Sequence, residues 1–266
     1  MSNLHRELAP ISSAAWDDIE AEAKRSFKRN VAGRRLVDVD GPHGLELSSV
    51  SIGHTVPIAS PRDGISAALR QTLPIVELKV PFTLSRSAID DVERGASDSD
   101  WDPVVAAARN IALAEDHAIF NGFAEAQILG IGQAASADAL TLPADVREYP
   151  DVISRAASAL RLASVDGPYS LAVSAEIYTQ INETTNHGYP IIEHVQRVVS
   201  GDIIWAPAID GAFLLSTRGG DFQLTIGQEL SIGYDSHDAA SVNLYFTESL
   251  SFAVWTPEAA VAIVTR

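Results

Sequence analysis

The sequence predicts a mixed α+β fold, and three observations carry this prediction. Residues 12–30 and 100–121 repeat their apolar side chains with the period of an amphipathic helix. Residues 76–84 alternate apolar and polar side chains with a period of two, which is typical of a strand. Residues 213–234 contain apolar runs separated by glycine-rich turns, which indicates three short strands. The 266 residues are enough for one large domain or two small ones.

Composition narrows the classes of function. The hydrophobic content of 46% is ample for a core, and the absence of cysteine excludes disulfides, thiol nucleophiles and thiolate metal sites. The formal net charge of −16 disfavours a nucleic-acid binder, because such proteins neutralise phosphates with a basic face. No apolar run approaches the ~20 residues that span a membrane, and the N-terminus lacks the layout of a secretion signal. We therefore expect a cytoplasmic protein without a membrane span.

The helix predicted over residues 12–30 has a cap, an apolar face and a basic end. Ser12 or Ser13 can cap its N-terminus, and Gly33 ends it. Its apolar face consists of Trp16, Ile19, Ala23 and Phe27. The end of the helix and the segment after it carry six basic residues, and residues 24–35 contain no acidic residue. The six are Lys24, Arg25, Lys28, Arg29, Arg34 and Arg35. The helix macrodipole favours bases at this end, but a concave patch that faces cargo or tolerates RNA is an open alternative.

Residues 36–84 predict a strand, a turn and a long arm. Residues 36–39 form the strand and residues 41–44 the turn, after which residues 45–84 predict a hairpin-like excursion with residues 76–84 as its second arm. The apolar phase of the first arm shifts between Leu47 and Val50, as a β-bulge would shift it, and residues 59–64 have turn chemistry. Pro81 cannot donate to a ladder, so its strand should have a free edge or join another chain. A two-stranded arm cannot bury both faces alone, which predicts contact between subunits.

The remainder of the chain alternates helices and strands. The helix over residues 100–121 can be capped by Asp98 or Asp100, and Asn121 and Gly122 end it. A compact α/β region is then predicted from helices at 151–163, 175–185 and 190–199 and strands at 169–174, 203–206 and 212–216. The strand-rich segment 241–264 is expected to return to the first domain.

Sequence motifs for chemistry are absent or incomplete. Residues 130–135 imitate a dinucleotide fingerprint, but a predicted helix rather than a strand precedes them. Residues 98–102 begin like a calcium loop, but Pro103 and Arg109 stand where the loop needs glycine and glutamate. The seven histidines form no paired histidine motif. The sequence also contains no motif that pairs a nucleophile with a base. We therefore expect no catalytic, cofactor or metal site, and no enzyme activity.

Short motifs along nearly the whole chain resemble those of one protein family and keep its order. They are Leu8-Ala-Pro10, Trp16, Gly33-Arg-Arg-Leu-Val-Asp-Val39, Gly41-Pro42, Pro81-Phe-Thr-Leu84, Asp90-Asp-Val-Glu-Arg-Gly95, Asp166-Gly-Pro-Tyr169, His187-Gly-Tyr-Pro190 and the strand-rich stretch 213–234. No single motif is specific, but the ordered set resembles the type 1 encapsulins, in particular the linocin-like encapsulins of actinobacteria and mycobacteria. These are bacterial shell proteins.

The resemblance implies a tailed-phage major-capsid-like fold and the function of a container. It divides the chain into an N-terminal helix with the start of a peripheral domain (1–44), an extended loop arm (45–84), the peripheral domain with its spine helix (85–130), an axial domain (131–228) and a C-terminal return to the peripheral domain (229–266). It implies a subunit that self-assembles into an icosahedral cage. The cage would enclose a cargo enzyme, a dye-decolourising peroxidase or a ferritin-like protein, recruited by a C-terminal peptide. Members of the family are also met in culture filtrates.

The resemblance also implies two sets of site residues. A cargo-peptide site on the inner surface would consist of Ile19, Ala23, Phe27, Arg34, Leu36, Asp38, Leu230, Ile232 and Tyr234. A loop around a five-fold pore would consist of Thr185, Asn186, His187, Gly188 and Tyr189. Ordinary core packing is the alternative for Phe27 and Ile232, and an exposed loop for His187. Some encapsulins bind flavin beside a tryptophan, but the matching position here is Ser87, so no flavin is expected.

Two other functions share some of these features. A prophage capsid protein would have the same fold and enclose nucleic acid, but the charge of −16 disfavours DNA packaging. A hydrolytic enzyme is the weaker alternative, because no nucleophile–base or metal pattern supports it.

Overall fold

The computed structural model describes residues 3–265 of the chain. Two five-stranded sheets organise this part of the chain. The first sheet has the order β1-β11-β13-β12, and β4 pairs with the edge of β13 opposite to β12. Its strands are β1 (Asp38–Asp40), β4 (Val76–Ser85), β11 (Phe222–Ile226), β12 (Ser231–His237) and β13 (Ser241–Val254). The second sheet has the order β5-β14-β10-β6-β9. Its strands are β5 (Leu140–Thr141), β6 (Tyr169–Val173), β9 (Ile203–Trp205), β10 (Ala212–Ser216) and β14 (Ala260–Val264).

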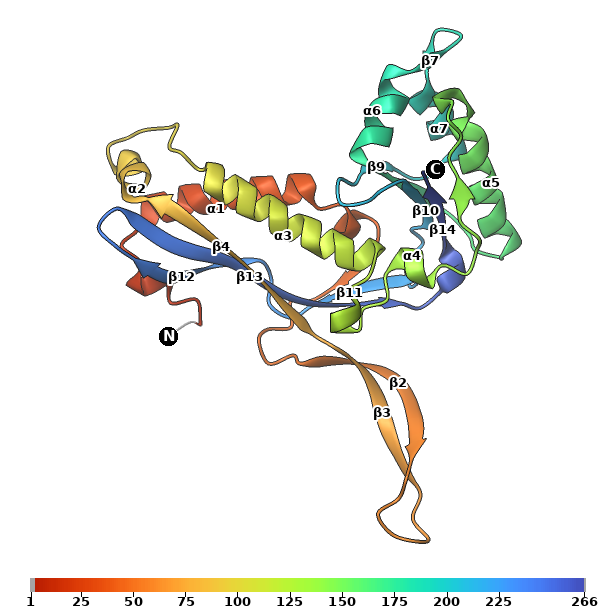
Figure 1. Cartoon of the computed structure of the whole chain (residues 1–266), viewed down its shortest axis with the longest axis horizontal. Helices are drawn as coiled ribbons and strands as arrows, with labels where there is room; N and C mark the ends of the chain where they lie inside the picture. The colour runs from red at the N-terminus through yellow and green to blue at the C-terminus, as the bar shows by residue number, and fades with distance from the viewer. Residues whose placement is uncertain (1–2, 266) are drawn as a thin grey trace.

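Three helices cover one face of the first sheet (Figure 1). They are α1 (Ser13–Asn30), α2 (Arg86–Glu93) and α3 (Asp102–Phe120). The side chain of Ser12 caps α1 by accepting a hydrogen bond from the backbone N–H of Ala15 at 3.2 Å. The sequence therefore predicted α1 and α3 to within two residues at each end, whereas α2 was not predicted.

A first hydrophobic cluster lies between these helices and the first sheet. The apolar face of α1 packs there, and Ile19 in its middle is fully buried. Phe82 of β4 stacks on Phe246 of β13 with ring centroids 4.9 Å apart. Burial of these faces in one cluster explains why the periodic segments of the sequence form stable helices and strands.

A second hydrophobic cluster fills the space around the second sheet. Four helices surround this sheet in Figure 1: α4 (Ile131–Ala134), α5 (Tyr149–Leu162), α6 (Ala175–Glu183) and α7 (Ile191–Val198). Beyond α6 and α7, a small hairpin of β7 (Thr185–Asn186) and β8 (Tyr189–Pro190) forms the tip of this part of the molecule. The mixed α+β class predicted from the sequence is confirmed.

The long arm differs from its predicted pairing. The hairpin consists of β2 (Ser49–Ile58) and β3 (Ala67–Pro74), and it projects away from both sheets (Figure 1). Residues 76–84 belong to β4 and pair with β13 instead, because Phe82 and Leu84 bury themselves in the first hydrophobic cluster. The irregularity in register lies between Ser51 and Thr55 rather than near residues 47–50. In the described chain β13 is the only strand partner of β4, so the predicted free edge at Pro81 is present.

The C-terminal segment divides between the two sheets. β13 lies in the first sheet, as expected for a return to the first domain, but β14 pairs with β10 in the second sheet. Residues 260–263 are all buried in the second hydrophobic cluster, which explains why β14 stays there. The predicted strand at residues 36–39 begins later, as β1, after a 3-10 turn at Gly33–Arg35.

Candidate functional site

A surface groove with a volume of about 770 Å³ lies between α1 and the start of β12. Its apolar lining consists of Leu4, Ala23, Phe27, Val31, Leu230, Ile232 and Phe246. Its polar lining consists of Arg6, Glu20, Lys24, Lys28, Arg34, Arg35, Glu229 and Ser231. Apolar sockets with polar groups at the margin suit an extended segment of chain that presents apolar side chains.

The groove brings together five of the nine residues expected at a peptide site. These five are Ala23, Phe27, Arg34, Leu230 and Ile232. Phe27 is 7% exposed and Ile232 is 5% exposed, so both belong to the first hydrophobic cluster while their edges line the groove. Core packing and a place in the groove are therefore compatible for these two side chains.

The other four residues are not among those that line the groove. Ile19 is fully buried on the face of α1 that packs in the first hydrophobic cluster, and Leu36 lies in the second. Asp38 accepts a hydrogen bond from the backbone N–H of Gly220. The hydroxyl of Tyr234 lies 2.6 Å from Nδ1 of His237, within hydrogen-bonding distance.

The basic cluster of residues 24–35 lies partly in the groove. Four of its six basic residues line the groove: Lys24, Lys28, Arg34 and Arg35. Arg25 instead pairs with Glu22 on α1. Charge placement at a helix end therefore does not describe the whole cluster.

Several groove residues were missed from the sequence. Arg6 lies over the ring of Trp16, with 4.0 Å between the guanidinium carbon and the ring centroid, and pairs with Glu20 at 2.5 Å. Phe246 and Glu229 come from segments more than 190 residues beyond α1 in sequence. Helical spacing places Glu20 one turn before Lys24 of the basic cluster, but nothing in the sequence pattern indicates the distant strands.

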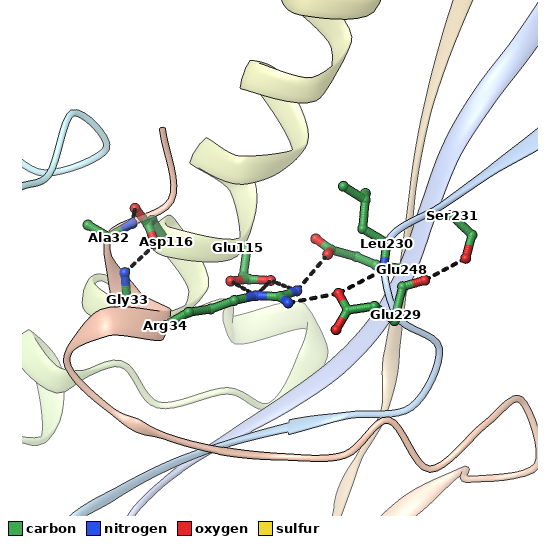
Figure 2. Close-up of polar contacts among 9 residues, drawn as sticks. All are labelled: Ala32, Gly33, Arg34, Glu115, Asp116, Glu229, Leu230, Ser231 and Glu248. Atoms are coloured by element: carbon green, nitrogen blue, oxygen red, sulfur yellow. Dashed lines mark hydrogen bonds and ion pairs between the residues drawn. The ribbon is translucent and has the colours of Figure 1, made fainter. Parts of the chain in front are cut away.

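Arg34 is the best-connected charged residue of the groove (Figure 2). Its Nε donates to Oε1 of Glu115 on α3 at 2.8 Å, and its Nη2 donates to Oε2 of the same carboxylate at 2.6 Å. Its Nη1 donates to Oε1 of Glu229 at 2.7 Å, and its Nη2 lies 3.3 Å from Oε2 of Glu248 on β13. The guanidinium carbon lies 5.0 Å from the ring centroid of Phe27. Such a planar fork is suited to several carboxylates at once.

Two of the three carboxyl groups around Arg34 are held out of water. The side chains of Glu115 and Glu248 are fully buried, whereas 46% of the side chain of Glu229 is exposed. Burial raises the pKa of Glu115 and raises the pKa of Glu248 well above its ordinary value, while Arg34 opposes both shifts. Burial lowers the pKa of Arg34, but hydrogen bonds to Glu115 and Glu229 outweigh this effect and the pKa is raised.

Asp116, next to Glu115 on α3, anchors the chain that leads out of α1. Its Oδ2 accepts a hydrogen bond from the backbone N–H of Ala32 at 2.8 Å, and its Oδ1 accepts one from Gly33 at 2.7 Å (Figure 2). Burial raises the pKa of Asp116 to about 7 even though both hydrogen bonds oppose the shift. This contact fixes the backbone that presents Arg34 to the groove.

The five residues expected at a pore form the β7–β8 hairpin. Thr185 and Asn186 make the first strand, and Tyr189 begins the second. His187 and Gly188 connect the strands with φ values of 50° and 87°, which is the geometry of a two-residue hairpin turn. Tyr189 is 58% exposed and contacts His194 of α7 edge-on. The loop is exposed at the tip of the molecule (Figure 1).

Neither a metal cluster nor a membrane helix is found within residues 3–265. In this range no group of three or more His, Asp or Glu side chains is placed to hold a metal ion. The helices within the same range are too short or too polar to cross a bilayer.

Comparison with known proteins decides the family. Residues 1–251 match the family described as "Encapsulating protein for peroxidase". Over 263 residues the chain is 61% identical to the type 1 encapsulin shell protein of Rhodococcus erythropolis, which covers 99% of this chain and 100% of the relative. The chain belongs to the type 1 encapsulin shell proteins. As a shell subunit, it assembles with copies of itself into a capsid-like oligomer.

Solved structures confirm the capsid-like fold of this encapsulin subunit. A virus-like particle from Pyrococcus furiosus matches with a TM-score of 0.63 at 16% identity, covering 92% of this chain and 98% of the other. The capsid of the myovirus XM1 matches with a TM-score of 0.53 at 10% identity, covering 85% and 89%. These likenesses show the fold alone, and the tailed-phage capsid fold expected from the sequence is confirmed.

Proposed function

We propose that the encapsulin shell encloses a cargo enzyme whose C-terminal peptide docks in the groove between α1 and β12. The groove carries this proposal, because it combines an apolar floor with charged margins in a volume of about 770 Å³. The family description names a peroxidase as what its members encapsulate, which supports a peroxidase as cargo, and the resemblance suggests one of the dye-decolourising class. A ferritin-like protein is the second cargo that the resemblance suggests.

The lining of the groove limits the chemistry of the peptide. Phe27, Leu230 and Ile232 belong to the apolar lining of the groove, so apolar side chains of the peptide would be removed from water there. Each such side chain contributes roughly 1.5–3 kcal/mol when fully buried. Arg34 is already held by Glu115 and Glu229, so it supplies a fixed wall rather than a free charge.

The test is retention of co-expressed cargo in assembled shells. We expect Ile232→Asp to form hollow particles by negative-stain microscopy but to lose the co-purifying enzyme identified by mass spectrometry. Leu230→Asp is the second variant, because Leu230 is only partly buried and its replacement disturbs the core less. Leu129→Asp, at an exposed position that does not line the groove, is the matched control and should retain cargo. Wild-type cargo retention by both groove variants would contradict the proposal.

We also propose that the β7–β8 hairpin lines a pore of the assembled shell. The exposed turn of His187 and Gly188 lies at the far tip of the molecule (Figure 1), where copies related by a symmetry axis can meet. Replacement of Tyr189 by alanine should then speed the entry of small solutes into cargo-free shells, measured by quenching of an enclosed fluorophore. An unchanged entry rate would contradict the pore assignment.

A further inference from the structure

The polar residues around Arg34 lie where the two hydrophobic clusters of the subunit meet. Three separate elements pass from the first cluster to the second at this level. The first cluster ends at Val31 after α1, at Ala112 on α3 and at Phe246 on β13. The second cluster begins on the same three segments at Ala32, Ala118 and Leu250. Arg34, Glu115 and Glu248 therefore form a polar layer between two apolar bodies.

This layer contains more carboxyl groups than one cation can balance. Glu115 and Glu248 are both fully buried, and Arg34 contacts both of them. Among the described residues, Oε1 of Glu248 has no hydrogen-bond partner. Two ionised carboxylates in this position would repel each other and leave acceptors unpaired, which is costly in a buried site. The side chains of Glu115 and Glu248 are in hydrogen-bonding contact, so a proton on Glu248 lets it donate to Glu115 and leaves the trio of Arg34, Glu115 and Glu248 neutral.

No nearby group offers a second cation for Glu248. The elements around it carry these charged groups: Glu115 and Asp116 on α3, Arg34 and Arg35 after α1, Glu229 before β12, Glu77 and Lys79 on β4, and Lys24 and Lys28 on α1. Arg34 is shared with Glu115 and Glu229, Lys79 lies 3.6 Å from the ring centroid of Tyr245, and β4 places the apolar Leu78 opposite Glu248. The closest charges are therefore mainly negative and favour retention of the proton.

We propose that Arg34, Glu115 and Glu248 form a proton-dependent latch between the two hydrophobic clusters of the subunit. The latch is closed while the two glutamates share one proton, because Glu248 then bonds Glu115 and Arg34 clamps both elements. Loss of that proton to solvent leaves two buried negative charges on α3 and β13 against one guanidinium. The resulting repulsion weakens the contact between α3 and β13.

The sign of the pH effect follows from linkage. A buried carboxyl group whose pKa is raised in the folded state binds a proton that the unfolded chain has already lost. Its contribution to stability is present at low pH and is lost as pH rises through the pKa in the folded state. The latch therefore weakens on the alkaline side. Arg34 and Glu229 also line the groove, so a change in the protonation of the latch alters the contacts of residues in the groove wall.

The first test compares glutamine variants of the assembled shell. Glu248→Gln keeps the shape and the donor of the protonated side chain without a group that titrates. We expect the melting temperature of the wild type to fall as the pH is raised into the alkaline range, and that of the variant to fall distinctly less. Glu258→Gln, at an exposed position, is the matched control and should follow the wild type. Equal pH slopes for all three proteins would overturn the latch.

The second test needs no variant and holds even if Glu248→Gln fails to fold. The C=O stretching band of a protonated carboxyl group is separate from that of a carboxylate in infrared difference spectra. We expect wild-type shells kept above the pKa of Asp116, which is about 7, to show a protonated band that disappears on further alkalinisation. Absence of such a band in folded shells would show that no proton is shared and would overturn the proposal.

Discussion

Asp116 holds two backbone N–H groups with one carboxylate in a site that is fully closed to water. The two hydrogen bonds favour the ionised form, whereas burial favours the neutral form. Burial is the larger effect, and the pKa is raised to about 7. Asp116 therefore holds the chain between α1 and β1 in place, and its contribution to the free energy of unfolding depends on pH.

The first prediction concerns this dependence. Between about pH 4 and about pH 7 the folded chain keeps a proton on Asp116 that the unfolded chain loses, so the free energy of unfolding should fall as pH rises. The slope is at most about 1.4 kcal/mol per pH unit. Asp116→Asn should remove this component of the slope and also destabilise the protein by about 1–3 kcal/mol, because one backbone N–H loses its acceptor.

Melting curves of the assembled protein at several pH values check this prediction. Asp98→Asn, on an exposed loop before α3, is the control and should keep the wild-type slope. An Asp116→Asn variant with the wild-type slope would mean that Asp116 stays ionised throughout the range.

At this scale the sequence predicted the apolar side of the groove better than its charged side. Ala23, Phe27 and Ile232 follow from a resemblance that fixes positions along the chain. The partners of Arg34 do not, because Glu115 is 81 residues away in sequence and Glu248 is 214 residues away. Helical spacing says which residues share a face of α3, but it cannot say which charge arrives from another element.

At the scale of elements, the pairing of β12 and β13 depends on one glycine. Gly233 is opposite Tyr245, whose ring covers the position that a Cβ atom would occupy. Lys79 of β4 lies over the same ring with its ammonium 3.6 Å from the centroid. Three neighbouring strands are thus joined on this face through an aromatic ring that needs an empty position beneath it.

The second prediction is that Gly233→Ala destabilises the subunit by about 1–3 kcal/mol, because the new methyl group displaces the ring of Tyr245. A double-mutant cycle measured by denaturant unfolding separates this effect from a change in the backbone. In a Tyr245→Ala background the same substitution should cost much less. An equal cost in both backgrounds would show that the ring is not the obstacle.

Elements were predicted more reliably than their partners. Alternation over residues 76–84 correctly indicated a strand, but period-two alternation says which face is buried and not which strand lies beside it. The hairpin partner of β2 is β3 rather than β4. Residues 67–74 of β3 lack the alternation because most of them are exposed, so the sequence pattern did not indicate this strand. β14 joins the second sheet for a similar reason, since its continuous apolar run fits either sheet equally well.

At the scale of the whole molecule, the β2–β3 hairpin is incomplete within one subunit. Val56 and Leu69 are directly opposite each other and are 43% and 61% exposed. Ile58, two residues along the same face as Val56, is 50% exposed. An isolated two-stranded hairpin is marginally stable in water, and an exposed apolar face on it indicates a contact with another chain.

The last prediction follows from this face and from the membership in a shell-forming family. Val56→Asp combined with Leu69→Asp should leave the subunit folded but prevent closed shells. Fully burying each apolar side chain contributes roughly 1.5–3 kcal/mol, and the loss of two at every contact lowers the association constant by more than about tenfold per contact. Size-exclusion chromatography with negative-stain microscopy measures assembly, and circular dichroism measures folding. Thr55→Asp, adjacent to Val56 but on the opposite face of β2, is the matched control and should assemble. Normal shells from the double variant would show that the hairpin's apolar face stays exposed to solvent in the assembly, and the contacts that close the shell would then have to come from the two sheets and their helices.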